Sequence, residues 1–554
     1  MHVAGEIFRS AVVNTSSSVL AHVAKRVIHL LGNSSLRDLK AEFIKNQQNR
    51  NREVYYDTLD WGAINRASAS DGEFADQIDI YLPLVILFQA TRLAAMLHDI
   101  GHPPFSHIVE YALLHARGHE PDLMGDHGNE RSHSQYLGHE AVGEILVERL
   151  VNCKTLRERS GFEESPKFAD VCLDLCQKIL RSTKKTEEFY TFKSSLVSGA
   201  VDADRLDYVR RDSYSAGMVP LYDIRPLIDG AFFRTTETGF EVGYRPNSLS
   251  ALENFFQARN DLYRYMIYHH DVARRNLAVQ RLLVRALDPG AQIPAEVADA
   301  AELFAVRAAG GADGTYETYE SFEDSALMNF LWFADAHLPK PSTKNERALK
   351  IYLDVILRRR NDKLRSLIKR PDGYERFARR VCEELRARKP ELLDSGKSDP
   401  VPLLNQLLRD RLDSIVNNDN GIDRKSKQNV AKISLSEAIE EKLDAAAISG
   451  VTQHQVKFKC YYFGTFSPGP NMDFSFSDPT EYGVSGEYIL AESISPTIAT
   501  LEAAWSNSPQ ISIFFQIPDG NSKIAASELR AIYFPHAVQG MVEFLVQPQI
   551  SEGG

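Results

Sequence analysis

The sequence is poor in cysteine, with 5 among 554 residues. Cys153, Cys172, Cys176, Cys382 and Cys460 lack a zinc-ribbon spacing, and so few thiols exclude a disulfide-rich secreted scaffold. The pair at 172 and 176 lies in an apolar helical stretch, so we expect buried free thiols there. No secretory signal opens the sequence, and no uninterrupted apolar run approaches the length that crosses a bilayer. These absences predict a cytoplasmic protein with no membrane partner.

Positive charge is also scarce. Lys and Arg number 64 against 75 Asp and Glu, which gives a formal net charge of −11 and a pI near 5.9. This balance excludes a nucleic-acid binder that works through bulk charge, although a local basic patch such as 358–360 can still meet a phosphate. Hydrophobic residues make up 43% of the chain, so we expect it to be folded in two or three domains.

The apolar pattern divides the chain into three predicted segments. Residues 1–305 form a helical core, almost entirely α up to about Asp288, with a polar surface insertion at about 33–79. Residues 315–450 form a helical extension. Residues 451–554 form a small α+β module, because 456–462 and 511–517 are β-branched and aromatic runs. The predicted fold class is therefore mainly α. The last module is either a structural or oligomerising lobe or a ligand-sensing one, and periodicity does not separate these.

The most informative run spans residues 97–107 and reads Leu-His-Asp-Ile-Gly-His-Pro-Pro-Phe-Ser-His. His98 and Asp99 offer a nitrogen and an oxygen to a divalent metal. A glycine and two prolines then end the preceding helix, 93–97, and turn the chain. We therefore expect His102 and His107 to project from a loop beside the metal, so that three imidazoles and a carboxylate converge on one cavity.

A second run, residues 201–212, holds four acids and three arginines in twelve positions. On a helix, Asp204, Tyr208 and Arg211 share one face by their i, i+4, i+7 spacing, and Asp212 lies close by. Composition alone would favour a solvated helix carrying ion pairs.

Together the two runs resemble the HD-domain metal phosphohydrolases, and Gly-His-x-Pro-Phe-x-His at 101–107 is similar to the branch that hydrolyses deoxynucleoside triphosphates. The resemblance implies an HD-domain helical core and a divalent cation (Mn, Mg, Fe, Co or Zn) held by His98, Asp99 and Asp204. It implies attack at the α-phosphorus, with a deoxynucleoside and tripolyphosphate as products. It also implies a homo-oligomer that a nucleotide can activate.

The resemblance also implies which groups move protons. His102, His107 and the His139-Glu140 pair would exchange protons with the nucleophile and with the leaving 5′-oxygen.

Five further residues would bind the substrate. Arg205 and Arg259 would offset the charge of the triphosphate. Tyr208 would pack on the sugar and leave no room for a 2′-hydroxyl, and Asp212 would read the sugar hydroxyl. Tyr268 would contact the nucleoside, with the register from Arg259 open by one residue.

One expected motif is missing. The family supplies a further metal histidine upstream of His98 within Arg-x-x-His-Ser-x-x-Val, and no such string occurs here. Residues 1–8 resemble its continuation, with Val3 in place of the valine, which would put the histidine two positions before Met1. Three explanations stand: a start codon placed too late, replacement by His2 or His22, or a true loss that leaves a weaker three-ligand site.

Three functional hypotheses follow. The first is a metal-dependent deoxynucleoside triphosphate triphosphohydrolase. The second is a nucleotide-binding regulatory protein whose catalysis is weakened because the first metal histidine is absent. The third is an HD-family hydrolase of another phosphoester, against which Arg205 and Arg259 argue because a monophosphate lacks a multiply charged tail.

Overall fold

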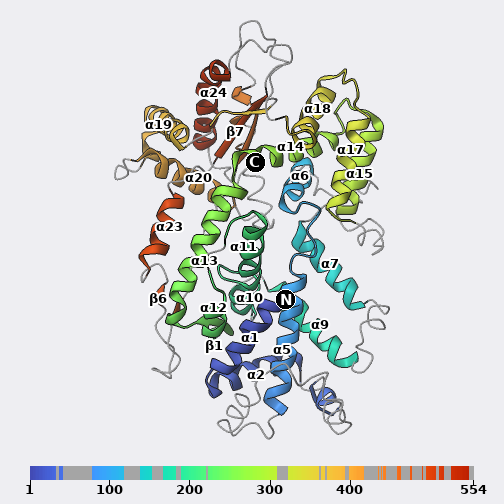
Figure 1. Cartoon of the computed structure of the whole chain (residues 1–554), viewed down its shortest axis with the longest axis vertical. Coiled ribbons are helices and arrows are strands. Elements are labelled where there is room, and N and C mark those ends of the chain that lie inside the picture. The colour runs from blue at the N-terminus through green and yellow to red at the C-terminus, as the bar shows by residue number, and fades with distance from the viewer. Residues whose placement is uncertain are drawn as a thin grey trace, which may run out of the picture. The chain divides into compact units, whose positions relative to one another are not determined.

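A computed structural model gives the structure of the chain (Figure 1) and is mainly α-helical, which confirms the predicted fold class. Contacts group it into unit 1 (Met1–Gly101, Gly143–Tyr263, Ser467–Glu502) and unit 2 (His102–Val142, Arg264–Phe466, Ala503–Gly554). The predicted boundaries near 305–315 and 450 remain predictions. The structure describes residues 1–32, 36–41, 78–117, 138–152, 166–182, 187, 189–219, 222–308, 322–360, 364–368, 371–393, 399–416, 435, 438–439, 441–443, 458–462, 475–476, 489–490, 495–506, 511–516 and 526–547.

Most helices of unit 1 precede residue 263. They are α1 (His2–Asn14), α2 (Ser17–Leu31), α5 (Ile78–Leu97), α9 (Pro166–Arg181), α10 (Tyr190–Leu196), α11 (Ala203–Ser215), α12 (Arg225–Gly230), a 3-10 turn (Pro246–Ser248) and α13 (Leu249–Leu262). Two more helices, α7 (His139–Asn152) and α23 (Pro496–Ser506), each have residues in both units. The predicted polar insertion at about 33–79 lies mostly outside the described residues.

Helix α5 is the central helix of unit 1 and packs against α1, α2 and α9. It is buried almost all round, including Tyr81, Ile86 and Phe88, as expected for a helix without a polar face. Helix α5 is long and apolar enough to cross a membrane by length and composition, with a window of mean hydropathy 1.7, although Gln89 and Arg92 interrupt its apolar run. Since 72% of that window is buried inside the protein, its apolar character is explained by its position in the core.

The expectation of an almost entirely helical first half needs one correction. β1 (Ala231–Thr235) and β2 (Phe240–Tyr244) form an antiparallel hairpin, with Phe233 opposite Val242. Its aromatic and β-branched residues favour strands, and Gly239 lies in the short turn. Two short strands, β5 (Ser475–Phe476) and β6 (Ile489–Leu490), extend this sheet in the order β1-β2-β5-β6.

Unit 2 combines helices with a second sheet. Its helices are α6 (His107–Arg117), α14 (His270–Ala286), α15 (Ala295–Ala308), α17 (Asp324–Ala336), α18 (Lys344–Leu357), α19 (Pro371–Arg388), a 3-10 turn (Pro390–Leu392), α20 (Pro400–Val416) and α24 (Ala526–Val546). A π-helical turn, Tyr263–Ile267, precedes α14 and begins at the last residue of the unit 1 segment.

The sheet of unit 2 has the order β3-β7-β4, from β3 (Leu364–Ser366), β7 (Ile511–Gln516) and β4 (Phe458–Tyr462). β7 pairs antiparallel with both neighbours. Ile511, Ile513 and Phe515 belong to a buried cluster with apolar residues of α19, α20 and α24. The two strands predicted at 456–462 and 511–517 are therefore present. The buried free thiols predicted at Cys172 and Cys176 are confirmed.

Candidate functional site

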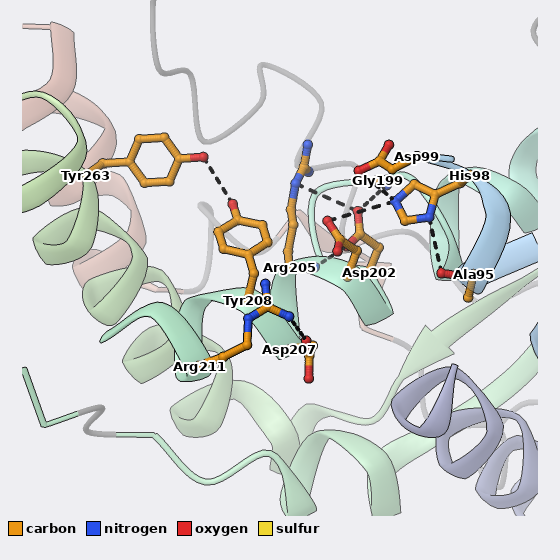
Figure 2. Close-up of polar contacts among 11 residues, drawn as sticks. Ala95, His98, Asp99, Gly199, Asp202, Arg205, Asp207, Tyr208, Arg211 and Tyr263 are labelled. Carbon is orange, nitrogen blue, oxygen red and sulfur yellow. Dashed lines mark hydrogen bonds and ion pairs between the residues drawn. The ribbon is translucent and has the colours of Figure 1, made fainter. Parts of the chain in front are cut away.

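The first candidate ligand, His98, directly follows α5. Its backbone N–H donates to the Ala94 carbonyl at 2.9 Å, which continues the helical pattern by one residue. Its ring Nδ1 lies 3.2 Å from the Ala95 carbonyl (Figure 2), so a proton on Nδ1 leaves the Nε2 lone pair available. Nε2 lies 3.4 Å from Oδ2 of Asp99 and 3.9 Å from Oδ2 of Asp204.

The start of α11 places Asp204. Asp202 is the N-cap residue of this helix, and its carboxylate accepts hydrogen bonds from the backbone N–H of Arg205 at 2.6 Å and of Gly199 at 2.7 Å (Figure 2). Burial raises the pKa of Asp202 to about 6, against the lowering effect of Arg205 and these hydrogen bonds. Asp202 therefore has a structural role, and it fixes the helical turn that carries Asp204.

His98, Asp99 and Asp204 form a group whose ligand atoms all lie within 4.8 Å of one another. Burial raises the pKa of Asp204, and the nearby Asp99 carboxylate adds to the rise while His98 opposes it. One imidazole nitrogen and two carboxylate oxygens suit a borderline or hard divalent cation. This donor set fits the predicted metal, which would also relieve the repulsion between the two carboxylates. Among the described residues, neither His2 nor His22 joins a metal-capable group.

An aromatic and cationic cluster lies on neighbouring helices of the same unit. The Tyr208 and Tyr263 side chains point toward each other in Figure 2, and their hydroxyls lie 3.1 Å apart. Arg259 is 5% exposed, and its guanidinium carbon lies 5.4 Å from the centre of the Tyr263 ring. Burial raises the pKa of Tyr208 above its ordinary range, although Arg259 opposes the rise. Two predicted substrate residues, Tyr208 and Arg259, are thus linked through Tyr263, which the sequence did not single out.

The other predicted substrate residues of α11 make contacts along the helix. Arg205 Nε lies 3.7 Å from Asp202. Arg211 donates to Asp207 at 2.6 Å and to Asp212 at 3.2 Å, and all three side chains are about half exposed. Asp204, Arg205, Tyr208 and Asp212 thus follow one another along a single helix, whose buried face is formed by Ala203, Leu206, Val209 and Ser213.

A second metal-capable group lies in unit 2 and consists of His102, His107, Glu110 and His139. Of the residues predicted to converge, His98 and Asp99 thus belong to the group in unit 1, and His102 and His107 to the group in unit 2. His102 lies in the turn between α5 and α6, as expected. His107, however, is the first residue of α6 rather than a loop residue, because the chain resumes a helix directly after Pro103, Pro104, Phe105 and Ser106.

Glu110 is the functional candidate that sequence reasoning missed. Its carboxylate accepts from His107 Nδ1 at 2.8 Å, and from Nδ1 and the backbone N–H of His139 at 2.7 and 3.0 Å. Burial alone would raise the pKa of Glu110, but these hydrogen bonds outweigh burial and bring it well below its ordinary range. With both Nδ1 protons directed at Glu110, each ring keeps Nε2 for other chemistry. The rings of His102 and His139 stack at 3.8 Å.

The roles of two predicted site residues, Glu140 and Tyr268, stay predictions. The side chain of Glu140 lies outside the described residues, although its backbone belongs to α7. Tyr268 is half-buried in unit 2, just after the π-helical turn, and its contact with a nucleoside stays a prediction.

Comparison with known proteins identifies the domain that contains the first ligand group. The HD-domain family model matches residues 87–209, which include His98, Asp99 and Asp204, so the chain carries an HD domain. An uncharacterized protein of Methanocaldococcus jannaschii is 24% identical over 200 residues, which cover 36% of this chain and 34% of the relative. YwfO of Bacillus subtilis, also uncharacterized, is 26% identical over 197 residues, covering 35% of this chain and 36% of YwfO.

A more distant relative has a named activity. The human deoxynucleoside triphosphate triphosphohydrolase SAMHD1 is 23% identical over 189 residues, which cover 33% of this chain and 29% of SAMHD1. The matched segments thus span about a third of each of these three relatives.

Proposed function

We propose that this protein is a metal-dependent phosphohydrolase that converts deoxynucleoside triphosphates to a deoxynucleoside and inorganic tripolyphosphate. The observation that carries the proposal is the grouping of His98, Asp99 and Asp204, with Tyr208 one helical turn beyond Asp204. The HD-domain match and the similarity to SAMHD1 support the reaction class.

The proposed metal role belongs to the first group. His98 would bind through Nε2 while Nδ1 donates to the Ala95 carbonyl, and Asp99 and Asp204 would each contribute an oxygen. When bound, the cation supplies Lewis acidity toward a phosphoryl oxygen and toward water.

The chain's own residues would select and hold the substrate. Arg259 and Arg205 bring permanent positive charges that offset the charge on the triphosphate. The Tyr208 ring, held through its hydroxyl by Tyr263, would pack against the deoxyribose and exclude a 2′-hydroxyl. Asp212 would accept a hydrogen bond from the sugar hydroxyl, and Tyr268 would contact the nucleoside.

The histidines of the second group would handle protons. His107 and His139 are held by Glu110 with Nε2 left for proton transfer to and from the reacting oxygens. The Glu110 carboxylate stabilises the positive charge that either ring acquires on protonation. His102 and Glu140 complete the proposed set.

The test is an assay with each deoxynucleoside triphosphate and Mn²⁺ or Mg²⁺, with products identified by phosphorus NMR. We expect tripolyphosphate from the wild type and at least about a tenfold lower rate from Asp204→Asn, since loss of a group that supports a metal typically costs about 10–100-fold in metal affinity or activity. Asp207→Asn is the matched control, because Asp207 lies on the same helix but pairs with Arg211 at the surface. Release of orthophosphate or pyrophosphate would place the protein in another class of HD hydrolase.

A nucleotide-binding regulatory protein is the second candidate. It is favoured by the presence of one imidazole among the three ligands of the first group. Tight binding of a deoxynucleoside triphosphate with no product over hours would select it over the first candidate.

The same proposal includes three properties of the whole protein. We propose a homo-oligomer, activation by a nucleotide, and a cytoplasmic location where deoxynucleotides are present. Light scattering tests the first, and the hydrolysis rate with and without added nucleotide tests the second.

A further inference from the structure

The turn between His102 and His107 has an unusual backbone. Phe105 and Ser106 have φ values of 59° and 53°, in the left-handed region, and neither is a glycine. L residues adopt this conformation at a cost because Cβ crowds the backbone carbonyl, and two in succession add their costs. Such a turn persists only where the surrounding structure holds it.

Local hydrogen bonds close the turn. The Ser106 N–H donates to the Pro103 carbonyl at 2.8 Å, and Ile108 and Glu110 donate to the carbonyls of Phe105 and Ser106. These bonds continue directly into α6, whose first residue is His107. His107, which contacts Glu110 three residues further along α6, is thus joined directly to the two left-handed residues before it.

One further hydrogen bond comes from far along the sequence. The Phe105 N–H donates to Oδ1 of Asp324 at 2.8 Å across 219 residues, and both belong to unit 2. Asp324 is the first residue of α17. Its carboxylate therefore accepts from one of the two strained residues and joins α17 to the histidine turn.

We propose that Asp324 is a positioning residue for the histidine group of unit 2. By accepting from Phe105, it stabilises the left-handed turn and so keeps His107 in hydrogen-bonding position on Glu110. The catalytic consequence rests on the proposed function, whereas the effect on the turn does not.

A purely local role for Asp324 makes a different prediction. An acid in the first turn of a helix stabilises that helix through the helix dipole, whatever it contacts. Glu323, the N-cap residue of α17, is the matched control, because it has the same charge at the same helix end and makes no side-chain capping bond. A dipole effect would act through both residues, whereas the proposed contact acts through Asp324 alone.

The first measurement is hydrogen exchange of the full chain, followed in peptides covering 103–112. We expect Asp324→Ala to speed exchange there by about three- to tenfold, because the lost bond is partly replaced by water. Asp324→Asn, which keeps an acceptor oxygen, should lie between Asp324→Ala and wild type, and Glu323→Ala should match wild type. Equal exchange in wild type and Asp324→Ala would overturn the proposal.

The second measurement is steady-state kinetics. Asp324→Ala should lower kcat by about three- to tenfold and leave KM within about twofold, because the turn carries proton-transfer groups rather than substrate-binding ones. Adding Ser106→Gly, which adopts positive φ at little cost, should restore most of kcat. A rise in KM alone, or no rescue by glycine, would contradict the proposal. A wild type inactive on every triphosphate would refute the proposed function, and the exchange result would still decide the role of Asp324.

Discussion

Glu110 offers the sharpest test of the histidine group. A hydrogen bond to a charged group contributes about 1.5–3 kcal/mol, against about 0.5–1.5 kcal/mol for a neutral one. The hydrogen bonds between Glu110 and His139 make this full contribution, because both side chains are only 7% exposed. His107 is 56% exposed, so water screens its bond to Glu110. Glu110→Gln should therefore lower the stability of this region by about 2 kcal/mol, because the two buried hydrogen bonds from His139 would then be made to a neutral acceptor instead of a charged one. Glu110→Ala should cost about 4 kcal/mol, since the buried His139 N–H also loses its acceptor.

The assay is hydrogen exchange in the first turn of α7. Costs of about 2 and 4 kcal/mol correspond to exchange about thirtyfold and about a thousandfold faster at neutral pH. Because hydrogen bonds hold the pKa of Glu110 well below its ordinary value of 4.5, its contribution is fully present above pH 4.5 and is lost as pH falls through the folded-state pKa. The difference between wild type and Glu110→Gln should therefore shrink in acid.

Glu144→Gln is the control, because Glu144 is exposed on the same helix and should leave exchange unchanged. If Glu110→Gln behaved like this control, or if its effect grew below pH 4.5, the reasoning about the buried carboxylate would be refuted.

Three further predictions follow from the same geometry. His98→Ala should lower the divalent metal content per chain at least about tenfold by elemental analysis, whereas His139→Ala should retain it, because the His139 ring is stacked and bonded to Glu110; equal losses would contradict this. Tyr208→Ala should raise the ratio of ribonucleotide to deoxyribonucleotide turnover about tenfold in competition assays, whereas Tyr208→Phe should leave it unchanged. An unchanged ratio in both variants would contradict steric exclusion of the 2′-hydroxyl by Tyr208. Asp202→Ala should lose about 1–2 kcal/mol in denaturant unfolding and Asp202→Asn much less. Since burial raises the pKa of Asp202 to about 6, wild type should gain stability over Asp202→Asn as pH falls below that value, and a loss would contradict the assignment.

The first ligand group could be predicted because the runs at 97–107 and 201–212 together resemble the HD-domain phosphohydrolases, while local signals place each residue on its own element. His98 and Asp99 directly follow α5, and Asp204 lies in the first turn of α11 at a position fixed by the Asp202 cap. The i, i+4 spacing also placed Tyr208 on the face of Asp204. Such relations depend on backbone geometry within a few residues, which a sequence pattern reflects directly.

The contacts that the sequence did not reveal are mostly non-local. Glu110 contacts His139 across 29 residues, and Asp324 contacts Phe105 across 219, so no spacing rule connects them. Tyr263 was missed because one tyrosine among 22 carries no signal without its partner hydroxyl. The hairpin at 231–244 was hidden by the helical pattern on both sides of it, since short apolar runs suit helix and strand alike.

The strand order β3-β7-β4 has a consequence for biosynthesis. The central strand leaves the ribosome last, about fifty residues after β4 and well over a hundred after β3, so both outer strands are synthesised before the strand they pair with. Nascent or truncated chains that end before residue 511 would expose the apolar side of α19 and α20, and we expect them to depend on chaperones.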